Sequence, residues 1–149
     1  RISKDNYPEE ALSFENIDYL EIVKEDNWFE SRLYELFTSR FLFAVFKEHI
    51  ENGISVFRLE RCFFWTMPQK DLVAAEEYWA DIKKHVLRDE IAPKYFYKDG
   101  DGKKFHVRPK AQKAANLSPT PSGTLAKKYC YWFNKSYVKE IVAKELENR

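Results

Sequence analysis

Eleven lysine and arginine residues lie between residues 94 and 139, a segment with only two acidic residues, so this basic block carries a net charge of +9. Residues 1–93 are acidic instead, with a net charge of −7. Arginine and lysine are the side chains that bind phosphate groups. A dense basic block in a chain of overall charge +1 therefore predicts a polyanionic partner. The alternative is a solvated basic face without a partner.

Arg108 is the best placed residue of the basic block for recognition. It stands directly before Pro109, and a proline at the first helical position predicts that residues 109–116 begin a short helix. The guanidinium group fits a phosphate, or the O6 and N7 atoms of guanine. The lysines that would add point charges around it are Lys110, Lys113, Lys127 and Lys128.

Aromatic side chains follow these lysines along the chain. Tyr129, Tyr131 and Trp132 lie in a predicted strand over residues 128–134. They offer surface on which bases could stack, as in many nucleic-acid binding proteins. Because successive strand residues point to opposite faces, about half of these rings are expected to be structural.

The acidic residues do not form a pattern that would hold a catalytic metal. Metal-dependent nucleases of the restriction type place two carboxylates beside a lysine, in an acidic residue followed by Glu-x-Lys or Asp-x-Lys. Glu-x-Lys is absent, and Asp-x-Lys occurs only at residues 81–83, within a predicted helix, and at residues 101–103, in a predicted turn. Cys62 and Cys130 lack the spacing of a zinc site and are expected to be buried free thiols. We therefore expect no catalytic residue and no metal site in this chain.

The length of 149 residues predicts a single domain, residues 1–149. Apolar residues make up 44% of the chain and charged residues 33%, which is typical of a folded protein with a charged surface. No apolar run approaches the ~20 residues of a membrane span, so we expect a cytoplasmic protein. The chain begins with Arg1 and its only methionine is Met67, so an upstream part is expected.

The apolar pattern predicts mixed α and β structure. Spacings of three and four indicate a helix of about five turns over residues 72–86. The apolar run 40–48 predicts a strand covered on both faces, central in its sheet. Asn52-Gly53 predicts a hairpin to a strand over 54–65, with an irregularity near Arg61. Further expected elements are a helix over 29–39, a hairpin between strands 94–98 and 103–109, a loop over 117–124, the strand over 128–134 and a helix opened by Ser136.

At FHVRPKAQKAAN and KKYCYWFNKSY the sequence resembles the MutH-type mismatch-repair nickase and the related restriction enzymes that cut at GATC. The stretches ALSFENIDYLEIV with Trp28, RFLFAVFKE and FFWTMPQKDLVAAEEYWADIKKHV extend the resemblance over nearly the whole chain. It implies a restriction-endonuclease-like α/β fold, with a mixed central sheet flanked by helices, and double-stranded DNA as the partner. It also implies that Arg108 and Lys110 form the Arg-Pro-Lys pair at the DNA, with Trp132 and Lys135 on the recognition strand.

The chain departs from this family at its start. In the family, the Asp and Glu-x-Lys that bind the metal precede the SFENID-like segment, and residues 1–3 here would be the tail of the corresponding strand. Some of these restriction enzymes resemble a tandem of two such folds, in which the second is a non-catalytic effector that binds another GATC copy. This chain resembles that second copy.

The resemblance therefore implies the C-terminal, DNA-binding effector domain of a bacterial type II restriction endonuclease. Its other partner would be the N-terminal catalytic domain of the same chain, and dimerisation on DNA would fit this interpretation. Mg²⁺ is expected to serve the parent enzyme and no cofactor is expected in this chain. Two alternatives are a truncated catalytic domain whose metal site lies upstream, and a protein-interaction domain that keeps the fold without binding DNA.

Overall fold

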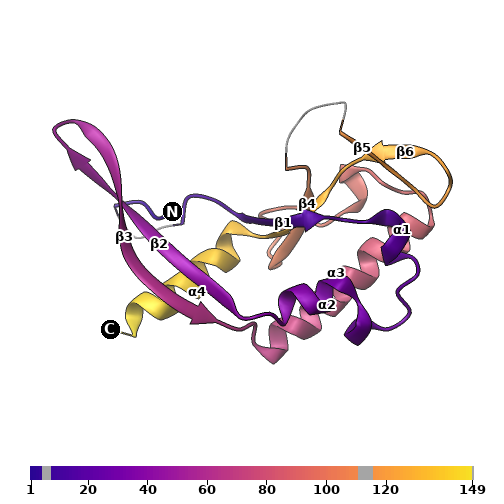
Figure 1. Ribbon diagram of the computed structural model, residues 1–149, viewed down its shortest axis with the longest axis horizontal. Coiled ribbons are helices and arrows are strands. Elements are labelled where there is room, and N and C mark those ends of the chain that lie inside the picture. Colours follow the sequence, from indigo (N-terminus) through magenta and orange to yellow (C-terminus); the bar gives the residue numbers. More distant parts are fainter. Residues whose placement is uncertain (5–7, 111–115, 149) are drawn as a thin grey trace.

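The computed structural model describes residues 1–4, 8–110 and 116–148, and this part of the chain is mixed α/β with small antiparallel sheets and four α-helices (Figure 1). The strands are β1 (Leu12–Asn16), β2 (Phe41–Glu51), β3 (Ile54–Trp65), β4 (Phe105–Arg108), β5 (Leu117–Pro119), β6 (Leu125–Lys127) and β7 (Cys130–Phe133). The helices are α1 (Tyr19–Ile22), α2 (Arg32–Phe37), α3 (Gln69–Leu87) and α4 (Lys135–Glu147), with 3-10 turns η1 (Trp28–Glu30) and η2 (Pro93–Tyr95).

A three-stranded sheet in the order β1-β7-β4 lies at the centre of the fold. Its core face is aromatic because Phe105 and Phe133 are paired across β4 and β7, and both are fully buried. The Phe133 ring lies 4.6 Å from that of Phe14 and 5.3 Å from that of Phe37, measured between centroids. Burial of these large rings is the main apolar contribution to stability in this region.

Helix α3 confirms the clearest prediction from the sequence. Its apolar residues at spacings of three and four, from Leu72 to Val86, are buried. Tyr78 on the same face donates from its hydroxyl group to the backbone oxygen of His106, at 2.5 Å. Helix α3 is thereby attached to strand β4 of the three-stranded sheet. Among the described residues, no helix has both the length and the apolar composition that crossing a membrane requires.

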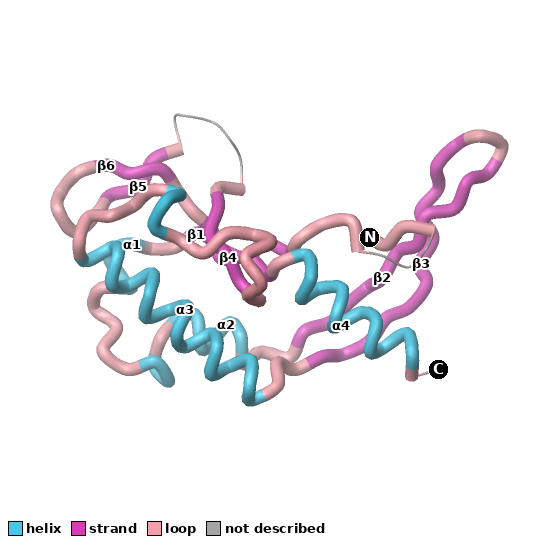
Figure 2. The backbone as a smooth tube through the Cα atoms, turned by 180° about the vertical axis from the view of Figure 1, so that it is seen from behind, coloured by secondary structure: helices cyan, strands magenta, loops and turns pink. Residues whose placement is uncertain are grey.

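Strands β2 and β3 form a long separate ribbon, and α4 lies along one side of it (Figures 1 and 2). The predicted turn is confirmed, since Asn52 and Gly53 both adopt positive φ angles. The predicted irregularity near Arg61 is also confirmed, because the register shifts between Val45 and Phe46. The prediction that residues 40–48 form a central strand is wrong. Among the described residues, β2 pairs along its length with β3 and has only an isolated bridge to Ile2 on its other edge, and every second side chain from Leu42 to Phe46 is exposed.

Several predicted boundaries differ from the structure for local reasons. The helix expected over 29–39 starts only at Arg32, because the Ser31 hydroxyl accepts a hydrogen bond from the Tyr34 backbone N–H at 3.1 Å and caps it there. Residues 94–98 form η2 and a loop rather than a strand, and β4 pairs with β7 instead. The expected loop over 117–124 contains strand β5, which pairs with β6. Asn134, rather than Ser136, precedes α4.

The helix predicted over 109–116 falls mainly on residues 111–115, which lie outside the described residues. The two cysteines differ from each other. Cys130 is buried as expected, whereas Cys62 is exposed on the β2–β3 ribbon, so the prediction of a second buried thiol is wrong. Burial of Cys62 would have required the second covered face that the ribbon lacks.

Candidate nucleic-acid interface

The face of the three-stranded sheet opposite the aromatic core carries polar and basic side chains. Strand alternation directs Phe105 and Val107 into the core and leaves His106 and Arg108 on the other face. In the register of β4 and β7, His106 is paired with Trp132, and Arg108 is paired with Cys130. We call this side the polar face of the sheet.

Three side chains form a stack on the polar face. The Arg108 guanidinium carbon lies 4.0 Å from the centroid of the Trp132 ring. The His106 ring is stacked with Trp132, at 5.6 Å between centroids and 19° between planes. The indole N–H of Trp132 donates to the backbone oxygen of Arg108 at 3.0 Å, so Trp132 holds both the backbone and the side chain of Arg108. The guanidinium, on an exposed residue, is the outer layer of the stack.

The base of the stack is fixed by an amide. The Asn134 side chain donates from Nδ2 to the Lys103 backbone oxygen at 2.7 Å, which leaves Oδ1 as the acceptor that faces His106. His106 Nδ1 lies 2.6 Å from that oxygen and therefore donates to it. Burial lowers the pKa of His106, so its ring is neutral at pH 7. A neutral imidazole beneath Trp132 adds no repulsion to the Arg108 guanidinium.

Arg108 differs from four other arginines of the chain in its charge environment, and like Arg40 it lies over an aromatic ring. Arg1, Arg32, Arg58 and Arg61 each form an ion pair with a glutamate. Within the described ranges, Arg108 forms no ion pair and contacts an aromatic ring instead. A guanidinium over an indole ring keeps its N–H donors available at the edges of its plane. Arg108 is therefore both oriented and free to bind an anion.

The structure brings three of the predicted lysines to the same end of the sheet as Arg108. Lys110 follows two residues after Arg108, and its Nζ donates to the backbone oxygen of Phe14 at 3.1 Å. Lys127 ends β6, and Lys128 donates from its backbone N–H to the Asn116 oxygen at 2.9 Å. None of these three forms an ion pair in the part of the chain that the structure describes. Lys113 lies outside the described residues.

The backbone that carries these lysines is held by a buried tyrosine. The Tyr19 hydroxyl donates to the Lys127 backbone oxygen at 2.6 Å and accepts from the Tyr129 backbone N–H at 3.2 Å. Burial raises the pKa of Tyr19 well above its usual value, so the hydroxyl keeps the proton that it donates. Residues 127–129 are therefore positioned by α1, on which Tyr19 lies.

Two predicted site residues are placed differently from the expectation. Trp132 is only 9% exposed and lies between Arg108 and His106, so it serves as a platform and does not offer a free ring to a base. Lys135 is exposed and is the first residue of α4, so it does not lie on strand β7. It follows the C-terminal end of β7, whereas Arg108 pairs with Cys130 at the N-terminal end. The sequence motifs do not identify His106 and Asn134 as site residues. The alternation of residues 105–108 is the signal that places His106 on the same face as Arg108.

Several of the acidic residues that line the pocket beside Arg32, and of those in the two Asp-x-Lys motifs, are engaged in structural contacts. A pocket of about 710 Å³ is lined by several carboxylates, but Arg32 pairs there with both Glu15 and Glu35. Of the two Asp-x-Lys motifs, Asp81 pairs with Lys84 on α3. The other motif is a turn in which the Asp101 carboxylate accepts from two backbone N–H groups. No group of three His, Cys, Asp or Glu side chains that could hold a metal ion is found among the described residues.

No protein-family model and no curated protein sequence matches the chain. The candidate site is therefore identified by its geometry. Its central feature is the stack of Arg108, Trp132 and His106, with Lys110, Lys127 and Lys128 at the same end of the sheet.

Proposed function

We propose that this chain is a DNA-binding domain with a restriction-endonuclease-like fold of the MutH type, and that it contacts duplex DNA through the polar face of the β1-β7-β4 sheet. The observation that carries the proposal is the exposed Arg108 guanidinium, which lies on Trp132 and is not neutralised by a carboxylate of the described chain. A fixed, planar donor suits the paired acceptors of a guanine edge or of a phosphate group.

The lysines supply the second part of the argument. Lys110, Lys127 and Lys128 form no ion pair with the described residues, and they lie close to the end of the sheet at which Arg108 lies. Such flexible charges suit phosphate groups, which position a protein on DNA without reading its sequence. The lysines would then contact phosphate groups, and Arg108 would contact bases.

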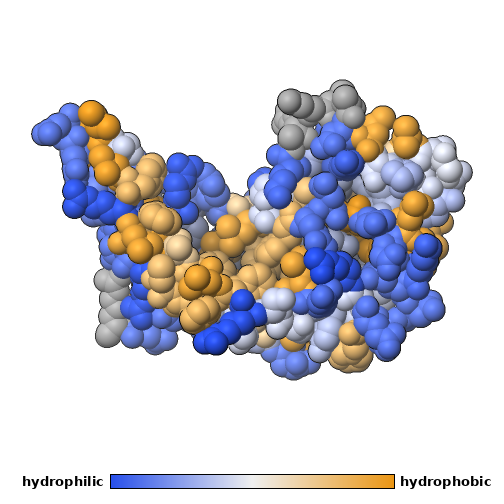
Figure 3. Space-filling model, in the orientation of Figure 1, coloured by the Kyte–Doolittle hydropathy of each residue, from blue (hydrophilic) through white to orange (hydrophobic). Residues whose placement is uncertain are grey.

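The shape of the molecule also supports this function. Figure 3 shows two projections, the tip of the β2–β3 ribbon and the lobe that contains β5 and β6, with a depression between them. The basic block of residues 94–139 contributes β4, β5, β6 and β7 to that lobe and its base. A depression beside a basic segment of the chain would be a suitable seat for a duplex.

Within this function, we favour the role of a non-catalytic effector domain of a type II restriction endonuclease that binds GATC-type sites. The resemblance at the Arg-Pro-Lys motif supports the GATC site, and the engagement of Glu15, Glu35, Asp81 and Asp101 in structural contacts supports a non-catalytic role. Mg²⁺ would then act in the catalytic domain of the parent enzyme.

Fluorescence anisotropy with a labelled GATC duplex and a scrambled duplex tests the proposal. If four to six basic residues contact phosphates, the logarithm of the binding constant should fall with the logarithm of salt concentration with a slope of about −3.5 to −5.5. A slope near zero would show that the basic block is only a solvated face. In a parallel assay with Mg²⁺, we expect the GATC duplex to stay intact. Cleavage that is lost on mutation of this chain's own acidic residues would identify a truncated catalytic domain instead.

A further inference from the structure

One face of the β2–β3 ribbon is covered by α4. The other, which we call the bare face, is largely exposed among the described residues, apart from the Arg1 guanidinium that lies over the Phe57 ring at 5.0 Å. Helix α4 packs on the first face, where Val45 and Phe63 are buried and Arg61 forms an ion pair with Glu145 at 2.8 Å. The opposite face carries six large apolar side chains that are 37–65% exposed, and apolar surface is visible along the ribbon in Figure 3. They are Leu42, Phe46, Ile50, Phe57, Leu59 and Phe64. Contiguous exposed apolar surface of this kind marks an interaction site.

The side chains of the bare face are arranged in rows across the two strands. In the register of the ribbon, the middle row is Ala44 with Cys62, both small and both exposed. A row of large residues lies on each side of it. The first is Leu42 with Phe64, and the second is Phe46 with Leu59. The apolar pattern is therefore nearly symmetric about the Ala44–Cys62 row.

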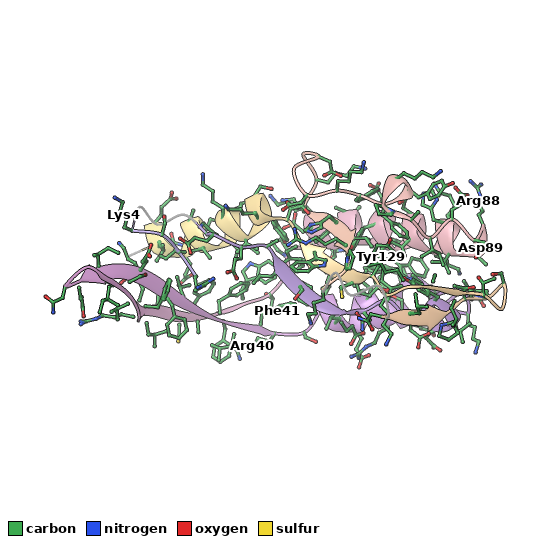
Figure 4. The ribbon with its side chains drawn as sticks, turned by 90° about the horizontal axis from the view of Figure 1, so that it is seen from above. Lys4, Arg40, Phe41, Arg88, Asp89 and Tyr129 are labelled. Carbon is green, nitrogen blue, oxygen red and sulfur yellow. The ribbon has the colours of Figure 1, made fainter. Side chains whose placement is uncertain are left out.

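Opposite charges lie at the two ends of this pattern. The Arg40 guanidinium lies over the Phe64 ring, 4.0 Å from its centroid, and Figure 4 shows Arg40 and Phe41 on opposite sides of the ribbon where β2 begins. At the other end, Glu48 follows Phe46 on the same face, because residues two apart in a strand share a face, and its carboxylate accepts a hydrogen bond from the Ser55 hydroxyl at 2.5 Å. The pattern thus reads positive, large, small, large, negative along the ribbon.

We propose that the bare face is a homodimer interface, in which two copies stack their ribbons face to face. The two-fold axis lies between the two ribbons and runs parallel to the Ala44–Cys62 row. The axis reverses the strand direction in the second copy. It therefore places the row of Leu42 on the row of Phe46, and Arg40 of each copy beside Glu48 of the other. A two-fold interface must be self-complementary in this way. Sheets packed face to face lie ~10 Å apart, with strands within about 30° of alignment.

The available area is sufficient for a weak dimer. The exposed apolar side chains amount to an area on the order of 500 to 600 Å² per copy, taking about 190 Å² for one large side chain. Under the proposed axis Phe57 and Ile50 extend past Arg40 of the second copy, so two copies would bury at most about 1,000 to 1,200 Å², the size of a weak interface. We therefore expect a reversible dimer with a dissociation constant in the micromolar range.

Sedimentation equilibrium of the full chain, without DNA, tests the interface. We expect dimers at ~100 μM. Leu42→Glu or Leu59→Glu should raise the dissociation constant at least tenfold, because each change places charge in the apolar rows. Leu87→Glu, at an exposed apolar residue of α3, is the matched control and should leave it unchanged. A chain that stays monomeric, or a control that weakens the dimer as much as Leu42→Glu does, overturns the proposal.

The orientation of the two copies is tested by charge exchange and by cross-linking. Arg40→Glu and Glu48→Arg should each raise the dimer dissociation constant, and the double variant should restore it. A short bismaleimide should cross-link two copies through Cys62, since Cys130 is buried and the axis brings the two Cys62 residues together. A double variant weaker than both single variants, or a dimer that does not cross-link, would contradict this axis.

Discussion

The Arg108 guanidinium lies 4.0 Å from the centre of the Trp132 ring, and the same indole donates its N–H to the Arg108 backbone oxygen at 3.0 Å. One side chain thus holds both ends of the residue that is proposed to meet DNA. Arginine normally loses side-chain entropy when it binds, and a guanidinium that is already oriented loses less. The pair therefore favours recognition of one geometry over general attraction to charge.

Replacing Arg108 should affect specific DNA more than random DNA. Arg108→Ala is expected to cost about 1–3 kcal/mol of binding free energy on a GATC duplex and much less on a scrambled duplex. Arg108→Lys should not restore the loss, because lysine lacks the planar fork of donors. Anisotropy titrations on both duplexes measure these differences. Equal losses on the two duplexes would make Arg108 a phosphate contact.

Trp132 should act through Arg108 rather than by direct contact. Trp132→Phe keeps a flat ring but removes the donor to the Arg108 backbone oxygen. We expect it to lower affinity for the GATC duplex, by less than Arg108→Ala does, and to have no further effect once Arg108 is already alanine. A double-mutant cycle measures this coupling. Additive losses would indicate that Trp132 has its own contact with DNA.

The lysines should contribute charge without selectivity. Lys127→Ala or Lys128→Ala is expected to weaken binding to both duplexes alike and to reduce the magnitude of the salt slope by about one. Lys84→Ala is the control, because Lys84 is paired with Asp81 on α3. Selective loss on the GATC duplex alone would assign a base contact to the lysine.

Local patterns in the sequence predicted several elements correctly, while long-range partners were not predictable. The helix over 72–86 and the Asn52–Gly53 turn depend on neighbouring residues, and both are confirmed. The run 40–48 is apolar at consecutive positions. This pattern is found both in a strand that is covered on two faces and in a strand with one bare face. Only the structure shows which face α4 covers.

The candidate site was predictable to a similar degree. Composition identified the basic block, and Arg108 with three of its lysines lies at one end of the sheet. The stack could not be predicted, since it needs the register of β4 against β7, which pairs His106 with Trp132. Twenty-five residues separate these two positions, and nothing local specifies how they align.

A buried carboxylate should contribute to stability away from the interface. The Asp71 side chain is almost fully buried, accepts from the Tyr137 hydroxyl at 2.8 Å, and pairs with Lys104 at 3.2 Å. Asp71→Ala removes the acceptor of the buried Tyr137 hydroxyl and one of the two carboxylate partners of Lys104, and is expected to lower the free energy of unfolding by about 2–4 kcal/mol. Glu140→Gln, at the more exposed partner of Lys104, should change it by less than ~0.5 kcal/mol. Urea unfolding measures both, and equal effects would contradict the role of Asp71.

The stability of the fold should decrease in mild acid because of His106. Burial lowers the pKa of His106 below its ordinary value of 6.5, so the unfolded chain takes up a proton at a higher pH than the folded chain does. Between those two pKa values the unfolded state binds more protons, and stability therefore rises with pH in this interval. The contribution is complete above pH 6.5 and is lost progressively as the pH falls toward the pKa of the folded state.

His106→Gln removes the titrating ring and keeps a side chain that donates toward Asn134, so it tests this origin directly. Urea midpoints of the unaltered chain are expected to fall as the pH is lowered from 7.5 to about 5, and the variant should show a shallower fall over the same interval. His49→Gln on the ribbon, distant from the stack in sequence and sheet, is the matched control and should keep the original slope. Identical slopes for the unaltered chain and His106→Gln would assign the acid sensitivity to other groups. They would also contradict the role of a neutral His106 imidazole in holding Trp132 and Arg108.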